Sequence, residues 1–337
     1  MASLKEIAED LGVSFSLVSK VLSGRMGNTG VSAATRKMIE DKARELDYRP
    51  NRLAVALKNG QKGSIAVFLH KMGTPGSELT SQFLDGLTHA FGKTNLRLWL
   101  RFFKSDEEFR AECSSRLVSE VDGLIVAGAE HPRLLADLEN IDQKGLPVVS
   151  VFCAHPNCAS PTNIAVDYRA QCYLTTKHLI ERGCSRIAHF RSSGNLRHQG
   201  YIDAHSEAGL PVWPRLIQTA DFKLEDGYNS AISLIESDEE FDAINCESDS
   251  QAIGAIKALR QRGFSVPEKV KVTGVDNSPL AVACEVPLTT VSSEMDICGK
   301  LAVETMLKKV AKEDVSPTVI QPKLIISEST GGAEPNV

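Results

Sequence analysis

The sequence of 337 residues lacks any long apolar segment. No run approaches the roughly 20 apolar residues that a membrane-spanning helix requires. At the N-terminus Lys5, Glu6, Glu9 and Asp10 interrupt any stretch of signal-peptide type. These absences exclude a membrane protein, and we expect a cytoplasmic protein.

Clustered cysteines and catalytic motifs are also absent. The eight cysteines are scattered, and the closest pair, Cys153 and Cys158, fits no common zinc spacing. We therefore expect reduced thiols and no metal site. The sequence has no nucleophile elbow and no P-loop, and the glycine-rich loop 23–30 follows no strand. We predict no catalytic residue and no cofactor, so an enzyme is the weaker alternative.

Charge is divided unevenly along the chain. Residues 1–62 carry 11 Lys and Arg against 7 Asp and Glu, whereas the remainder carries 27 against 36. A basic N-terminal segment on an acidic body is typical of a protein that binds nucleic acid through that segment alone.

Three short amphipathic helices are predicted in the basic segment. An apolar stripe at i, i+3, i+4 and i+7 is formed by Leu4, Ile7, Ala8 and Leu11. Ser3 and Glu6 form a capping-box start, Gly12 ends the first helix, and Ser14 caps the second. A third helix is expected from Ser32 to about Asp47, with Met38 and Ile39 among its inward residues. The pattern predicts either a helix-turn-helix unit or a plain three-helix cap.

A short, isolated helical segment follows in "YRPNRLAVALKNGQKGS". Pro50 ends the third helix, and Gly60 closes a piece of fewer than ten residues, which is marginal in water without a partner. Such a helix is expected to order on DNA, with Leu57 as an apolar wedge in the minor groove.

The motifs "IAEDLGVSFSLVSKVLSG", "VSAATRKMIEDKARELDYRPN" and "NRLAVAL", in this order, resemble the DNA-binding head and hinge of the lactose-repressor (LacI/GalR) family of transcription regulators. The resemblance implies a set of DNA-contacting residues: Phe15, Ser16, Ser19, Lys20, Asn51, Arg52, Ala54 and Leu57. Family members often carry an aromatic followed by Gln or Arg where this chain has Phe15 and Ser16, and Ser reads bases ambiguously.

After Gly63 the pattern alternates between short apolar strands, such as "SIAVFLH" and "DGLIVAG", and helices. This alternation predicts parallel sheets covered on both faces, and the number of strands predicts two lobes. The overall fold class is α/β: an all-α helix-turn-helix head plus a two-lobed core of doubly wound parallel sheets.

The body resembles the effector-binding core of the same family, which has the type I periplasmic-binding-protein fold. Segments that carry the resemblance include "AVDYRAQCYLTTKHLIERGCSRIAHF" and "SDSQAIGAIKALRQRGFSVPEKVKVTGVDN". Three residues match family pocket positions: Arg197 as a fork for hydroxyls or a carboxylate, Asp276 as an acceptor, and Phe222 as a stacking ring. Without the resemblance, a structural Arg–Asp pair and a core Phe are equally good interpretations.

The expected domains are residues 1–49 for the head, 50–62 for the hinge helix and linker, 63–327 for the effector-binding core, and 328–337 for a flexible tail. Within the core, the N-lobe is expected at 63–161 plus 292–316, and the C-lobe at 162–291 plus 317–327. Because no leucine heptads follow "PKLIISEST", a homodimer is expected rather than a tetramer.

The sequence therefore predicts a ligand-responsive, sequence-specific DNA-binding regulator, expected to be a repressor of carbohydrate-related genes. Its expected partners are a near-palindromic double-stranded operator and a small-molecule effector, for which a sugar is the class that the family implies. A regulator without a small-molecule effector and a solute-binding protein are the alternatives. The latter shares the body but not the basic head.

Overall fold

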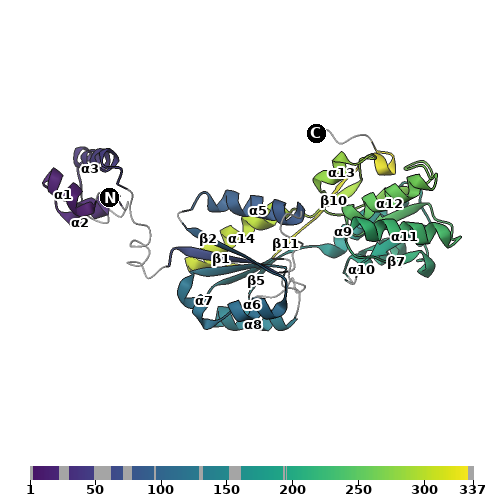
Figure 1. Ribbon diagram of the computed structural model, residues 1–337, viewed down its shortest axis with the longest axis horizontal. Coiled ribbons are helices and arrows are strands. Elements are labelled where there is room, and N and C mark those ends of the chain that lie inside the picture. The colour runs from purple at the N-terminus through teal and green to yellow at the C-terminus, as the bar shows by residue number, and fades with distance from the viewer. Residues whose placement is uncertain are drawn as a thin grey trace. The chain divides into compact units, whose positions relative to one another are not determined.

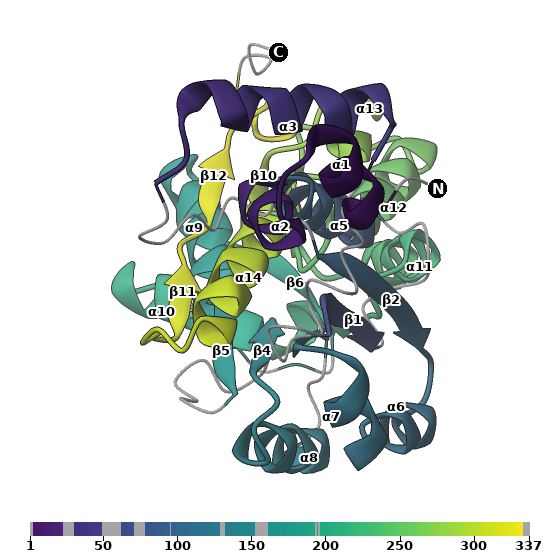
Figure 2. The same cartoon turned by 90° about the vertical axis from the view of Figure 1, so that its left-hand side faces the viewer.

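The computed structural model describes residues 3–22, 30–48, 62–70, 78–94, 96–128, 132–151, 161–192, 194 and 196–332. The chain divides into two compact units, Met1–Gly63 and Ser64–Val337, and each is described by itself (Figures 1 and 2). None of the helices in the described ranges has the length and apolar content that a bilayer crossing requires.

The first unit holds three helices: α1 (Leu4–Leu11), α2 (Phe15–Leu22) and α3 (Ala33–Glu45). The predicted capping box is present, because Ser3 Oγ accepts from Glu6 N and Glu6 caps Ser3 N in return. Gly12 ends α1 in the left-handed conformation at φ 62°, which glycine adopts without strain.

The apolar stripes of these helices meet in one small core. Its buried members are Ile7, Ala8, Val18, Val21, Ile39 and Ala43. Met38, expected to face inward, is 41% exposed instead. It precedes Ile39 by one residue, and a 100° turn of the helix places it outside the stripe.

The second unit contains a six-stranded parallel sheet that defines the N-lobe. Its strand order is β11-β5-β4-β3-β1-β2. The strands are β1 (Ser64–His70), β2 (Arg97–Phe103), β3 (Gly123–Ala127), β4 (Val148–Val151), β5 (Thr162–Val166) and β11 (Thr318–Ile320). Helices α5 (Glu78–Phe91) and α14 (Met295–Val310) cover one face (Figure 1). The other face is covered by α6 (Asp106–Glu112), α7 (Ser115–Glu120) and α8 (Pro132–Gln143), seen below the sheet in Figure 2.

A four-stranded parallel sheet in the order β7-β6-β8-β9 defines the C-lobe. Its strands are β6 (Ile187–Arg191), β7 (Ile217–Thr219), β8 (Ala243–Cys246) and β9 (Lys271–Thr273). One face packs against α9 (Tyr168–Glu181) and α10 (Leu196–Glu207), and the other against α11 (Leu224–Glu236) and α12 (Asp249–Gln261). The remaining elements are η1 (Pro214–Leu216), α13 (Pro279–Ala283), η2 (Glu328–Thr330) and an antiparallel pair, β10 (Thr290–Ser292) with β12 (Lys323–Ile325).

Two expected lobe boundaries are wrong. The sequence-based limits assign residues 162–166 and 318–320 to the C-lobe, but β5 pairs with β4, and β11 pairs with β5, in the N-lobe sheet. A short apolar strand looks the same in either sheet, so the pattern alone does not fix its partner. The expected flexible tail also begins too early, because Ser329 and Thr330 are buried and His178 Nε2 lies 2.9 Å from Thr330 Oγ1.

Candidate functional site

The second helix of the head presents the predicted base-reading residues. Phe15 is 55% exposed and Ser16 is exposed, whereas Ser19 and Lys20 are half-buried. Ser14 Oγ accepts from Leu17 N at 3.2 Å and starts this helix. The four residues therefore share one short element, with the two N-terminal ones most open to solvent. The other predicted contacts, Asn51, Arg52, Ala54 and Leu57, lie outside the described residues.

The three predicted effector residues come together at the carboxyl edge of the C-lobe sheet. Arg197 is the second residue of α10, Phe222 precedes α11, and Asp276 follows β9. The Arg197 guanidinium carbon lies 5.4 Å from the Phe222 ring centre, and its Nη2 lies 3.9 Å from Asp276 Oδ1. Residues separated by 79 positions in the sequence thus form one cluster.

Two further side chains, Gln171 and Ser293, close this cluster into a ring. Arg197 Nε donates to Gln171 Oε1 at 2.9 Å, and Gln171 Nε2 donates to Ser293 Oγ at 2.9 Å. Ser293 Oγ in turn donates to Asp276 Oδ1 at 2.9 Å. We call Gln171, Arg197, Asp276 and Ser293 the effector ring. Gln171 and Ser293 were not predicted from the sequence, because neither side chain is charged or belongs to a recognised motif.

Aromatic rings lie on the Arg197 guanidinium. The Tyr168 ring centre lies 5.1 Å from the guanidinium carbon of Arg197, and the Phe222 ring centre lies 5.4 Å from the same atom. Arg197 retains 15% of its side-chain exposure, whereas Phe222 is 48% exposed. Phe222 therefore offers an apolar face beside a largely buried polar ring, and such a combination is typical of small-molecule sites.

Burial shifts the ionisation of the ring. It raises the pKa of Asp276 to about 6, although Arg197 and Ser293 act in the opposite direction. Burial also lowers the pKa of Arg197, but the combined effect of Asp276, Tyr168, Cys172 and Glu247 is larger and the net pKa is raised. The guanidinium therefore stays charged, and the carboxylate beside it loses its charge in mild acid.

The Asp276 backbone is held in an uncommon conformation. Asp276 and Asn277 have φ values of 115° and 50°, in the left-handed region that costs a non-glycine residue about 1–3 kcal/mol. Asp276 N donates to Val291 O at 2.8 Å, and Asn277 N donates to Thr290 Oγ1 at 3.2 Å. Ser278 N donates to the buried Asp249 Oδ2 at 2.7 Å. These bonds fix the position of the Asp276 carboxylate.

A second buried polar group lies at the end of the neighbouring strand. Glu247 directly follows β8 and is fully buried, and its Oε2 accepts from Ser192 N and Oγ at 2.9 and 2.6 Å. Its Oε1 lies 3.4 Å from His189 Nε2, and His189 stacks on Tyr201 at 4.5 Å. A carboxylate directly after a short, fully buried strand was the signal that could have revealed this group.

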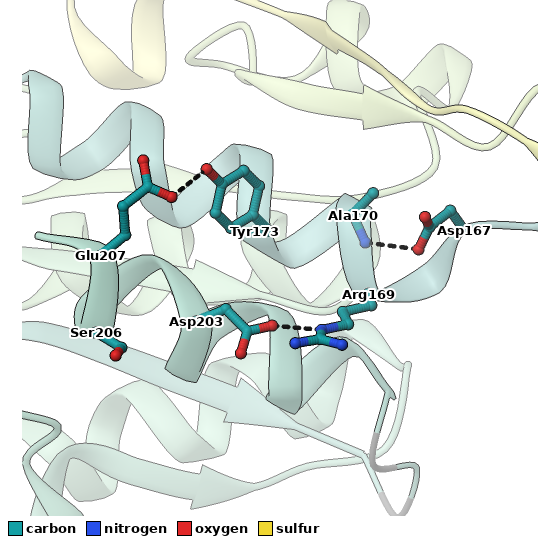
Figure 3. A pocket seen from close by; sticks show the side chains of 7 residues that line it. All are labelled: Asp167, Arg169, Ala170, Tyr173, Asp203, Ser206 and Glu207. Atoms are coloured by element: carbon teal, nitrogen blue, oxygen red, sulfur yellow. Dashed lines mark hydrogen bonds and ion pairs between the residues drawn. The ribbon is translucent and has the colours of Figure 1, made fainter.

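A separate hollow of about 510 Å³ lies between α9 and α10 (Figure 3). Four of its lining side chains form two pairs: Arg169 binds Asp203, and Tyr173 Oη donates to Glu207 at 2.5 Å. Because these side chains already bind one another across the two helices, we do not assign a ligand to the hollow. In the described ranges, no group of three or more His, Cys, Asp or Glu side chains could hold a metal ion.

Two family models match the chain. Residues 3–51 match the model of bacterial regulatory proteins of the lacI family, and residues 176–330 match a periplasmic binding protein-like domain. The chain belongs to the lacI family of bacterial regulatory proteins. This lacI-family protein is a DNA-binding transcription regulator.

Relatives cover nearly the full length of the lacI-family chain. The "HTH-type transcriptional repressor PurR" of Pasteurella multocida (strain Pm70) is 28% identical over 98% of both chains. The protein of the same name from Serratia proteamaculans (strain 568) is 29% identical over 96% of both.

Solved structures share the fold. The lac repressor dimer bound to operator and the anti-inducer ONPF has a TM-score of 0.80 at 20% identity, covering 98% of this chain and 99% of that one. The CelR–cellobiose complex has a TM-score of 0.70 at 24% identity, covering 98% and 100%. These structures confirm the predicted fold class, and the family models together with the relatives confirm the predicted family.

Proposed function

We propose that this lacI-family protein is a ligand-responsive repressor that binds a near-palindromic operator as a homodimer in the cytoplasm. The observation that carries the proposal is the effector ring with Phe222 beside it, at the edge of the sheet where open α/β folds bind ligands. The names of the relatives, which are transcriptional repressors, support the direction of regulation.

In this proposal the head reads DNA through α2. Phe15 and Ser16 lie at the exposed start of the helix, and Ser19 and Lys20 follow on the same element. A recognition helix contacts base edges mainly through its N-terminal residues. The hinge residues Asn51, Arg52, Ala54 and Leu57 are proposed to contact the minor groove and backbone, on the basis of sequence alone.

The effector acts through the Asp276 segment. Asn277 O accepts a hydrogen bond from Gln82 Nε2 of the N-lobe helix α5 at 3.4 Å. A ligand that contacts Asp276 therefore acts one residue from a contact with the other lobe. Such a contact suits a change in lobe position that alters operator affinity, and the coupling is reciprocal: an inducer binds the operator-bound form more weakly.

The test begins with the full chain and an operator selected from random duplex DNA. Sugars, including cellobiose, and nucleosides are then screened for release of the protein from that operator. Arg197→Ala should abolish the response while keeping operator affinity. The matched control Arg262→Ala removes an exposed arginine paired with Glu236 at the far end of α12 and should respond normally.

Two outcomes separate the alternatives. If the selection yields no preferred duplex, the DNA-binding half of the proposal is wrong. If an operator is found but no compound changes its affinity, a regulator without a small-molecule effector becomes the better description.

A further inference from the structure

We infer that the effector is a ring compound that carries no phosphate or carboxylate group, and that the site selects against such anions. This inference rests on the proposed function, because it concerns the chemistry of the same effector ring.

The cation of the effector ring is already engaged. Anions are usually bound by arginine through two parallel hydrogen bonds from its guanidinium. Here the Arg197 Nε donates to Gln171, and Nη2 faces Asp276 Oδ1 at 3.9 Å. A carboxylate or phosphate bound to Arg197 would compete with Asp276 for the same positive charge and would bring a second anion beside a buried carboxylate. A neutral hydroxyl or amide can instead bind beside both groups.

The helix N-termini at this edge already carry carboxylates. A helix N-terminus is the ordinary backbone site for a phosphate. At α9, however, Asp167 Oδ1 accepts from Ala170 N at 2.9 Å, and Asp249 opens α12. Glu225 and Asp226 occupy the first turn of α11, and Glu294 precedes α14 directly after Ser293 of the ring. An incoming anion would meet like charge at the starts of α9 and α11, whereas the Glu294 carboxylate is paired with Lys323 at 3.4 Å and the buried Asp249 is held toward its neutral form.

These helix ends are tied to the ring by observed contacts. Tyr168 at the start of α9 lies on Arg197. Ser248 Oγ, the cap of α12, donates to Phe222 O at 3.2 Å. Lys223, the cation next to Phe222, is exposed and stands between the exposed Asp221 and Glu225. The local charge at the Phe222 end of the site is therefore acidic.

The two buried acids show that burial disfavours a negative charge in this part of the site. Burial, followed by the charge of Asp276, raises the pKa of Asp249 to about 8. Burial raises the pKa of Asp276 itself to about 6. Two carboxyls that are held toward their neutral forms mark a region with little capacity for further negative charge.

The exposed face of Phe222 is the reason why we expect the ligand to contain a ring. Its face is half exposed and lies 5.4 Å from the Arg197 guanidinium carbon. The C–H face of a sugar or the face of a nucleobase can stack there, while its polar edge reaches the acceptor Asp276. Both ligand sources share this chemistry, and the experiment has one arm for each.

The full chain is titrated calorimetrically with matched pairs of ligands. One arm compares cellobiose and glucose with glucose 6-phosphate, and the other compares adenosine with adenosine monophosphate. We expect a neutral member of one arm to bind at least about tenfold more tightly than its phosphorylated counterpart. The arm that binds identifies the source as a sugar or a nucleoside.

The opposite preference would overturn the inference. If a phosphorylated member binds more tightly and Arg197→Ala removes that binding, the effector site stands and only its charge selection is wrong. If none of these compounds binds at millimolar concentration, or if binding is indifferent to Arg197→Ala, the effector half of the proposed function falls with the inference.

Isosteric variants test the cause of the selection. Asp276→Asn removes the ring carboxylate, and Asp167→Asn keeps the cap of α9 while removing its charge. Each should shift the ratio of neutral to phosphorylated affinity toward the phosphate, by about tenfold for Asp276→Asn and less for Asp167→Asn. The control Glu236→Gln, at the opposite end of α11 from Phe222, should leave the ratio unchanged. Unchanged ratios in both test variants would contradict the inference.

Discussion

The head and the C-lobe present their candidate functional residues in opposite ways. On α2, Phe15 and Ser16 are exposed at the surface of a unit with a small core. In the C-lobe, Arg197 and Asp276 are largely buried and held by hydrogen bonds from other elements. Surface residues of the head can be substituted with little effect on its fold. In the C-lobe, by contrast, the same contacts stabilise the fold and form the site.

The largest difference in stability between the two units is expected when one glycine in each unit is replaced by alanine. A Cβ at Gly200 of α10 would lie 1.9 Å from Arg169 O of α9, whereas a Cβ at Gly12 meets nothing within 4 Å. Gly200→Ala must therefore separate two helices that carry Arg197 and Gln171, at a cost of about 3 kcal/mol. Gly12→Ala faces only the φ of 62°, which costs about 1 kcal/mol.

Urea unfolding of the full chain measures both effects, with the two units followed by separate probes. Gly200→Ala should lower the midpoint of the core transition and leave that of the head unchanged. Equal effects of the two variants on their own units would show that the close approach of α9 and α10 does not limit core stability.

A smaller effect, on effector affinity, is expected when the effector ring is interrupted at its uncharged residue Gln171. Gln171→Ala leaves Arg197 Nε without its acceptor and removes one of the two hydrogen bonds of Ser293 Oγ. A hydrogen bond to a charged group contributes about 1.5–3 kcal/mol. We expect effector affinity to fall by at least about tenfold, measured by calorimetry with the compound found in the screen.

The matched control is Gln199→Ala, which removes an exposed amide that donates to Asp203 on the same helix as Arg197. It should bind effector normally. If both variants bind equally well, Gln171 does not position Arg197.

The two buried acids predict that the stability of the core depends on pH. The folded-state pKa values of Asp249 and Asp276 are raised to about 8 and about 6, so the folded state binds their protons more tightly than the unfolded state. The contribution of these two groups to stability is therefore greatest in acid and falls as pH rises from about 4 to about 8. In the head, the Lys42–Asp10 pair at 3.1 Å is partly exposed and should contribute little.

Thermal unfolding across this range tests the assignment. Asp249→Asn should flatten the decline above about pH 6, because it removes the group with the higher pKa. A wild-type core whose stability rises over the same range, or a variant with an unchanged profile, would contradict the role of Asp249.

The head was predictable because each of its helices determines its own buried face. The stripe at Leu4, Ile7, Ala8 and Leu11, the capping box and the end at Gly12 are local signals, and the structure contains all of them. Met38 was misplaced by one position in a helix that is mostly polar, where the stripe is narrow.

The effector site was only partly predictable. Arg197, Phe222 and Asp276 came from a family resemblance, and the structure brings them together. Gln171 and Ser293 could not be found, since their role depends on α9 and the start of α14 meeting α10. Strands β5 and β11 were placed in the wrong lobe for the same reason: partner choice is a tertiary property that a short apolar run does not encode.

The smallest expected effect lies in the head. Lys20→Ala removes one cation from α2, so operator affinity should fall by about 1 kcal/mol and the salt slope of binding by about 1. The control Lys37→Ala removes an exposed cation from α3 and should have a weaker effect. Fluorescence anisotropy with the selected operator across a salt series measures both. Effector affinity should be the same in both variants, since α2 belongs to the unit that does not contain the effector ring. If Lys20→Ala binds operator as tightly as the wild type at every salt concentration, α2 does not face the DNA, and the head would have to bind through another of its surfaces.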